Sequence, residues 1–299
     1  MPVLAMLIGL IAVSTAGPFI LLAPIGPFAL PAWRMLSVTL ILMPLAAPRL
    51  AEDFKRLNTA DRLKLLLSGV LYGFHFVFFT WAFDHTSKES AVVLLGAQPL
   101  MAATIGAIWL KEPITRWVAI SSIIAIAGIV LFGWNDSITD MRQLIGDGMV
   151  LACCLLIVIS YSFGRGLRPK MSLVGYLTAL YGIGGLTSLA VALAKGDALW
   201  GYPGQTWIFL GCAILIPTLI GHSMFHYAVK YVPVFYINLA ILGEPVIALL
   251  MMLALKDQFE VFAKSTLTPL QAAGGLLLLT GVAFGMIAAQ RSSTQKEKP

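Results

Sequence analysis

Charged residues are scarce in this sequence. Only 11% of the 299 residues are Asp, Glu, Lys or Arg, against roughly 25% in ordinary soluble domains, while 59% are hydrophobic. Such a composition does not supply a surface that faces water, so we expect the chain to lie in a lipid bilayer. The net charge of +6 is therefore not taken as a sign of a nucleic-acid partner, because the position of each base matters more than the sum in a membrane protein.

Residues and motifs that would indicate an enzyme or a metal site are also lacking. The only cysteines are Cys153, Cys154 and Cys212, and all three lie inside apolar runs without ligand spacing. There is no Gly-x-Ser-x-Gly, no glycine-rich phosphate loop and no His-Glu-x-x-His. His222 and His226 share a helix face, but no acidic residue lies between them. We therefore expect no enzymatic activity, no metal and no cofactor.

Long apolar runs fill most of the chain. A membrane-spanning helix needs about 20 mostly apolar residues, and the charged or Pro/Gly-rich interruptions divide the sequence into ten such stretches with short connectors. The predicted spans are 3–22, 31–48, 63–83, 90–110, 115–134, 146–165, 173–194, 205–228, 233–255 and 269–290. The predicted fold class is an all-α integral membrane protein with ten transmembrane helices and no soluble domain.

The distribution of Lys and Arg between the connectors predicts the orientation. Of the 20 bases, Arg34 lies one turn inside the second span, and five lie in connectors on one side of the membrane: Lys88, Arg142, Lys195, Lys256 and Lys264. The remaining 14 lie on the side of the two termini. Because cytoplasmic connectors carry the excess of positive charge, we expect an inner-membrane protein with both termini in the cytoplasm.

The two halves of the sequence resemble each other. A shift of 146 residues places Gln98-Pro99 on Glu244-Pro245 and Trp81-Ala82 on Tyr227-Ala228. This predicts two repeats of five helices, residues 1–143 and 144–299. Because five is odd, the second repeat must enter the membrane from the opposite side, which is the inverted plan common in secondary transporters, with the substrate site between the halves.

A family resemblance rests on the stretch WAFDHTSKESAVVLLGAQPLMAATIGAIWLKEP in the first half and ILGEPVIALLMMLALKDQ in the second. These stretches resemble the EamA-type repeats of the drug/metabolite transporter superfamily. The resemblance implies a ten-helix fold with a central cavity walled by helices 1, 3, 4, 6, 8 and 9. It further implies transport of small solutes such as amino acids, sugars, nucleobases or drugs, and we favour the branch that exports amino acids, including aromatic ones.

Glu244 is the first candidate for a functional residue. It is the only one of the 14 acids that lies near the middle of a predicted span, and an ionisable residue inside a membrane is a functional candidate by default. Pro245 follows it and frees a backbone carbonyl of the preceding turn, and Gln98-Pro99 repeats this arrangement in the fourth span. The alternative is a protonated Glu244 that only holds neighbouring helices together.

The remaining candidates for substrate binding are histidines, aromatic residues and one serine. His75 and His222 lie within one residue of equivalence in the two repeats, so both are expected at one cavity. Aromatic side chains would suit a flat cargo, and Ser14 stands where members of the family often carry tryptophan. The complete predicted set is Glu244, Gln98, His75, His222, Phe79, Trp81, Tyr161, Tyr227 and Ser14. Arg34 is instead expected to extend its side chain to the lipid headgroups.

We therefore predict a secondary transporter, an exporter of small metabolites and most of all of amino acids, that works by alternating access. Its expected partners are a small-molecule substrate and the lipid bilayer, without nucleic acid, and we expect a monomer. Transport of a drug, nucleobase or sugar is the nearest alternative. A channel or an intramembrane enzyme is more remote, because ion filters need rings of carbonyls or charges and no motif of a reacting group is present.

Overall fold

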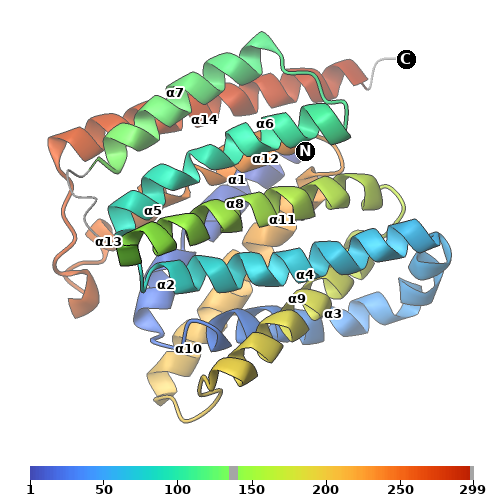
Figure 1. The fold of residues 1–299 in the computed structure, drawn as a ribbon, viewed down its shortest axis with the longest axis horizontal. Helices are drawn as coiled ribbons and strands as arrows, with labels where there is room; N and C mark the ends of the chain where they lie inside the picture. The colour runs from blue at the N-terminus through green and yellow to red at the C-terminus, as the bar shows by residue number, and fades with distance from the viewer. Residues whose placement is uncertain (135–140, 297–299) are drawn as a thin grey trace.

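A computed structural model describes residues 1–134 and 141–296. Lys298, one of the bases counted above, lies outside this range. The described part is a bundle of helices that run roughly along one direction (Figure 1). The first half contains α1 (Pro2–Val13), α2 (Ala16–Leu22), α3 (Ala29–Lys55), α4 (Thr59–Ala82), α5 (Lys88–Leu95), α6 (Ala97–Trp109) and α7 (Arg116–Phe132).

The second half repeats this order with more interruptions. It contains α8 (Met141–Leu167), α9 (Leu173–Lys195), α10 (Gly204–Ala213), the π-helix η1 (Ile214–His222), α11 (Ser223–Ala228), α12 (Val234–Ile241), α13 (Glu244–Ala254), the short 3₁₀ helix η2 (Glu260–Phe262) and α14 (Pro269–Lys296). Pro217 lies inside η1, where a proline removes a backbone donor and permits the wider helical turn.

Helix length and apolar composition confirm the predicted fold class. Within the described residues, nine helical segments are long and apolar enough to cross a membrane, and α7 is a shorter apolar helix of 17 residues. Together they make ten spans, five in each half, and no strand occurs among the described residues. Because five crossings separate equivalent points of the two halves, the halves are inverted relative to each other.

The packing of the helices has the symmetry expected of a repeat. The second, fourth and fifth spans of one half pack on the same spans of the other half, as α3 on α9, α6 on α12 and α7 on α14. The first span of each half packs on the third span of the other, as α1 on η1 and α11, and α8 on α4. The pair of α7 and α14 forms one edge of the bundle, and α3, α9 and α10 lie at the opposite edge (Figure 1).

Two aspartates link the repeats reciprocally. The carboxylate of Asp197, just after α9, accepts hydrogen bonds from the backbone N–H groups of Phe28 (2.8 Å) and Ala29 (3.0 Å) at the start of α3. Asp53, near the end of α3, accepts a hydrogen bond from the N–H of Ser172 (3.0 Å) at the start of α9. The first N–H groups of a helix have no partner within the helix, so an acidic side chain there satisfies them and stabilises the helix start.

The fourth span of each half is interrupted at the same place, as the two Pro pairs predicted. The first interruption separates α5 from α6 at Gly96, and the second separates α12 from α13 at Leu242-Gly243. Gln98 and Glu244 therefore lie in the first turn of the helix that follows each break. Glu244 is the eleventh of the 21 residues of the span Val234–Ala254, which confirms its central position along the helix.

Glycines bring the paired helices into close contact, among them the two pairs with small-xxx-small spacing, Gly69 with Gly73 and Gly281 with Gly285. A β-carbon added to Gly73 would lie 2.5 Å from the carbonyl oxygen of Gly184 on α9, and one added to Gly281 would lie 2.5 Å from the backbone nitrogen of Ala125 on α7. Helices in membranes associate through small residues of this kind. The shortest such distance to a backbone atom is at Gly128, where the added atom would lie 2.2 Å from the nitrogen of Leu278.

We expect Gly128→Ala to separate α7 from α14 and to lower the free energy of unfolding by about 1–3 kcal/mol, because the methyl group meets backbone that cannot rotate away. Gly211→Ala is the matched control, since a β-carbon there has open space and alanine favours a helix. Thermal unfolding of the two purified variants in detergent measures the difference. Equal midpoints would show that the seam between α7 and α14 tolerates side chains.

Candidate functional site

A small cavity lies between the two repeats, where the two interrupted spans meet. Its volume is about 50 Å³, and its walls come from the first, second, third, fourth, sixth, eighth and ninth spans. The lining residues are Ala16, Arg34, His75, Phe76, Phe79, Leu95, Gln98, Ile157, His222, Asn238, Ile241, Leu242 and Glu244. Seven of these thirteen residues are apolar and six are polar or ionisable, so the cavity combines apolar walls with convergent polar groups, as small-molecule sites do.

Hydrogen bonds hold several of the polar side chains in place. The Nε2 group of Gln98 donates to Oδ1 of Asn238 at 2.8 Å, which joins α6 of one repeat to α12 of the other. Asn238 donates in turn to the carbonyl of Val234 one turn earlier in its own helix (2.8 Å). Nδ1 of His75 lies 2.8 Å from the carbonyl oxygen of Cys153. The position of these groups is therefore defined before any cargo binds.

Arg34 and Glu244 are the charged residue types among the lining residues. The prediction that Arg34 extends to the lipid headgroups is wrong, because the residue is only 2% exposed and faces this cavity. Its Nε donates to the hydroxyl of Thr218 at 2.9 Å, and its guanidinium carbon lies 5.0 Å from the centre of the Phe76 ring. Neither Arg34 nor Glu244 takes part in the ion pairs that the described residues form.

The structure brings together five of the nine residues predicted from the sequence as substrate contacts, namely Glu244, Gln98, His75, His222 and Phe79. The other four do not line this cavity. Trp81 packs edge-on against Phe28, Tyr161 is fully buried beside His226 with ring centres 4.8 Å apart, Tyr227 packs on Tyr231, and the hydroxyl of Ser14 donates to the carbonyl of Leu10.

Asn238 was missed in the sequence, although a signal was present. It is an amide near the middle of an apolar span, and such polar residues tend to bond across helices. In the structure Asn238 is fully buried and is the partner of Gln98.

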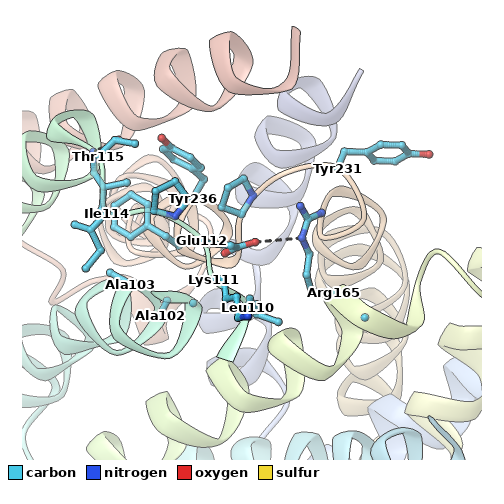
Figure 2. Close-up of a pocket in the computed structure, with 16 residues that line it drawn as sticks. Ala102, Ala103, Leu110, Lys111, Glu112, Ile114, Thr115, Arg165, Tyr231 and Tyr236 are labelled. Carbon is cyan, nitrogen blue, oxygen red and sulfur yellow. Dashed lines mark hydrogen bonds and ion pairs between the residues drawn. The ribbon is translucent and has the colours of Figure 1, made fainter. Parts of the chain in front are cut away.

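A second and larger cavity of about 300 Å³ lies at one end of the bundle (Figure 2). Its walls come from the end of α6, the connection to α7, the end of α8 and the start of α12. Glu112 and Arg165 face each other across it, with Oε1 of Glu112 3.2 Å from Nε of Arg165 (Figure 2). Lys111, with a left-handed φ of 55°, turns the chain just before Glu112.

The pair of Glu112 and Arg165 joins the two repeats. The other carboxylate oxygen of Glu112 accepts a hydrogen bond from the N–H of Val234 at the start of α12 (3.1 Å). Arg165 donates to the carbonyls of Val229 (2.8 Å) and Lys230 (2.5 Å) in the connection before α12. Four segments are therefore held together at this end: the α6–α7 connection, α8, and both sides of the α11–α12 connection.

The two cavities lie in series along the pair of helices α6 and α12. Gln98 lines the central cavity, and Ala102, one turn later on α6, lines the larger one. On α12, which belongs to the inverted repeat, Asn238 lines the central cavity and Phe235, three residues earlier, lines the larger one. Gln98 and Asn238, which are hydrogen-bonded to each other, are the central-cavity residues of α6 and α12 nearest in sequence to those of the larger cavity. A central cavity of 50 Å³ is far below the roughly 300–1,000 Å³ of ligand pockets, so its walls must move apart to admit a solute.

Comparison with known proteins agrees with this architecture. Residues 1–134 and residues 144–287 each match the EamA-like transporter family. The chain belongs to the EamA-like transporter family. The two matches cover the helices of both halves, so this is a transporter of small solutes across a membrane, built from two EamA repeats.

Individual EamA-like relatives are distant in sequence. The chain is 23% identical over 195 residues to the "Uncharacterized transporter YxxF" of Bacillus subtilis (strain 168), a match that spans 64% of this chain and 61% of that protein. It is 21% identical over 281 residues to the "Uncharacterized transporter YyaM" of the same organism, covering 91% of this chain and 89% of the other. A protein of known crystal structure shares the fold, with a TM-score of 0.75 at 17% identity, over 97% of this chain and 98% of that one.

Proposed function

We propose that this transporter exports amino acids, aromatic ones among them, by alternating access through the central cavity. The observation that carries the proposal is the place of Glu244: an acid in the middle of its span, at the start of α13 and in a cavity between the repeats. Burial of a charged acid inside a membrane opposes folding, so such a residue is expected to have a function. We infer that Glu244 binds the ammonium group of the cargo, or a proton that is exchanged for the cargo.

The other lining residues suit the rest of an amino acid. Phe76 and Phe79 offer aromatic faces on α4, and Gln98 and Asn238 offer amides on α6 and α12. Aromatic faces favour flat apolar side chains and also attract cations. Export is the direction that the family resemblance implies, and the match to the EamA-like family supports transport of small solutes.

The orientation follows from the positive-inside rule, with both termini cytoplasmic. In that orientation the α6–α7 connection, which follows the fourth span, lies in the cytoplasm together with the larger cavity. Glu112 and Arg165 then hold the cytoplasmic ends of the repeats together, and their separation would open the central cavity to that side. Rocking of one repeat against the other around a fixed site is the expected mechanism.

The test is transport by the purified protein in vesicles. Uptake of radiolabelled phenylalanine, alanine, a nucleobase and a hexose is measured with and without a pH gradient, and empty vesicles are the control. We expect saturable uptake of phenylalanine that a pH gradient accelerates. Saturable uptake of only the nucleobase or the hexose would reject amino acids as the cargo, and a non-saturable flux of ions would indicate a channel.

A further inference from the structure

Arg34 has an unusual environment for a cation. The residue is 2% exposed, and it lies on α3 within the second span. A guanidinium stays charged in proteins, so it cannot escape the penalty of burial by losing its proton. Buried charges are normally paired with an opposite charge and hydrogen-bonded. The ion pairs formed by the described residues do not include Arg34.

One side of the guanidinium is occupied by the protein. Nε donates to the hydroxyl of Thr218, and that hydroxyl donates in turn to the carbonyl of Ala213 (2.8 Å), so η1 holds it in place. The guanidinium carbon lies over the Phe76 ring, 5.0 Å from its centre. These contacts orient the fork, but they are made with neutral groups.

The other side is not used. Nη2 of Arg34 is buried and has no hydrogen-bond partner in the protein, and the residue lines the central cavity. A buried donor without a partner is strongly unfavourable. A planar guanidinium with free N–H groups matches a carboxylate, which it binds with two parallel hydrogen bonds.

We propose that Arg34 binds the carboxylate of the cargo and thereby selects solutes that carry one. The inference rests on the proposed function, because it assigns the second charged group of the same site. Glu244 lines the same cavity without an ion pair to Arg34, so both charges are available to a ligand. A zwitterion places its carboxylate at Arg34 and its ammonium group at Glu244, with its side chain beside Phe79.

The experiment uses three ligands that differ by one group. Phenylalanine carries both charges, 3-phenylpropionate lacks the ammonium group, and 2-phenylethylamine lacks the carboxylate. Their dissociation constants are measured by tryptophan fluorescence on the purified protein in detergent, for the wild type, Arg34→Gln and Arg34→Lys. Arg168→Gln is the matched control: this arginine is also buried, at 4% exposed, but it donates to the carbonyls of His226 (3.1 Å) and Met171 (2.7 Å) and does not line the cavity.

Arg34→Gln is expected to weaken binding of phenylalanine and 3-phenylpropionate about 10- to 100-fold, the range of a charge-assisted bidentate contact, and to change binding of 2-phenylethylamine by less than about threefold. Arg34→Lys should fall between, because an ammonium group is a point charge without the planar fork. Arg168→Gln should leave the ratios between the three ligands unchanged. Equal effects of Arg34→Gln on all three ligands, or none on any, would overturn the inference and leave Arg34 as a structural cation.

Binding of the three ligands by the wild type distinguishes a failure of this inference from a failure of the proposed function. If the wild type binds phenylalanine and 3-phenylpropionate, and Arg34→Gln weakens both relative to 2-phenylethylamine, a carboxylate site is supported even if vesicles fail to transport amino acids. Binding of only 2-phenylethylamine would overturn the role of Arg34 while leaving a transporter of organic cations. Binding of none of the three ligands would reject both.

Discussion

Glu244→Gln is expected to remove the acceleration of amino-acid uptake by a pH gradient while leaving part of the binding. Glutamine keeps the size and the hydrogen-bonding capacity of the side chain but cannot take up or release a proton. The charged and titratable groups that face Glu244 in the cavity are Arg34 of α3, His75 of α4 and His222 of η1. They remain in the variant, so loss of the pH effect identifies Glu244 as the group that couples proton movement to transport.

Glu244→Ala should be more severe, because it removes the polar contact as well as the titration. We expect transport to fall about 10- to 100-fold, which corresponds to the loss of one hydrogen bond to a charged group. Glu260→Gln, in the connection before α14, is the control, because that residue is exposed and lies outside the cavity. Equal transport by the wild type and both Glu244 variants, at matched protein levels, would leave Glu244 as a contact between helices and remove the proposed coupling.

The second large effect is expected at the hydrogen bond between Gln98 and Asn238. Asn238→Leu leaves the Nε2 group of the buried Gln98 without its acceptor, and an unpaired buried polar group destabilises a protein by about 1–3 kcal/mol. Gln98→Leu should destabilise by a similar amount. The double variant should be less destabilised than the sum, because neither amide then remains unpaired.

Thermal unfolding in detergent measures this cycle, with vesicle transport measured in parallel. Thr104→Val on α6 is the control, because that hydroxyl is exposed and donates only to Leu100 of its own helix. Transport should fall in both single variants and should stay low in the double variant, since the amides are also expected to contact the cargo. Additive losses of stability would show that the two residues act independently and do not link the repeats.

The main features of the fold could be predicted because they depend only on patterns along the sequence. Apolar length predicts the spans, and a proline preceded by a polar residue marks both interruptions, at Gly96 and at Leu242-Gly243. Pairs of small residues predict the close helix contacts, as at Gly73. Each of these signals requires only the sequence spacing of a single helix.

The lining of the cavity was predicted less completely, because it depends on how each helix is rotated about its axis. Successive residues of a helix are about 100° apart, so Phe79 lines the cavity whereas Trp81, two residues later, faces Phe28 and the end of α9. Tyr161 lies on the same face of α8 as Ile157 but one turn further along, and at that depth it packs on His226 instead. Aromatic residues on the correct helix therefore identify neither the correct face nor the correct depth.

The environment of the Arg34 side chain could not be predicted from the sequence either. Its position near the end of a span predicts that its head can reach the headgroups. The structure places it instead on the face of α3 that contacts η1, where Thr218 accepts its hydrogen bond. Only the pairing of helices from opposite repeats decides between these two environments.

We propose that cargo crosses through the cavity lined by Ala16, Arg34 and Glu244, which opens to each side of the membrane in turn. The most direct measurement is labelling of Ala16→Cys, in a variant without the three native cysteines, by a membrane-impermeant thiol reagent added to either side of oriented vesicles. Ala16 is 5% exposed and lines the cavity at the start of α2. We predict labelling from both sides, and protection by phenylalanine but not by a solute that is not transported. Labelling from neither side, or labelling unaffected by a cargo that the same vesicles transport, would rule out alternating access through this cavity.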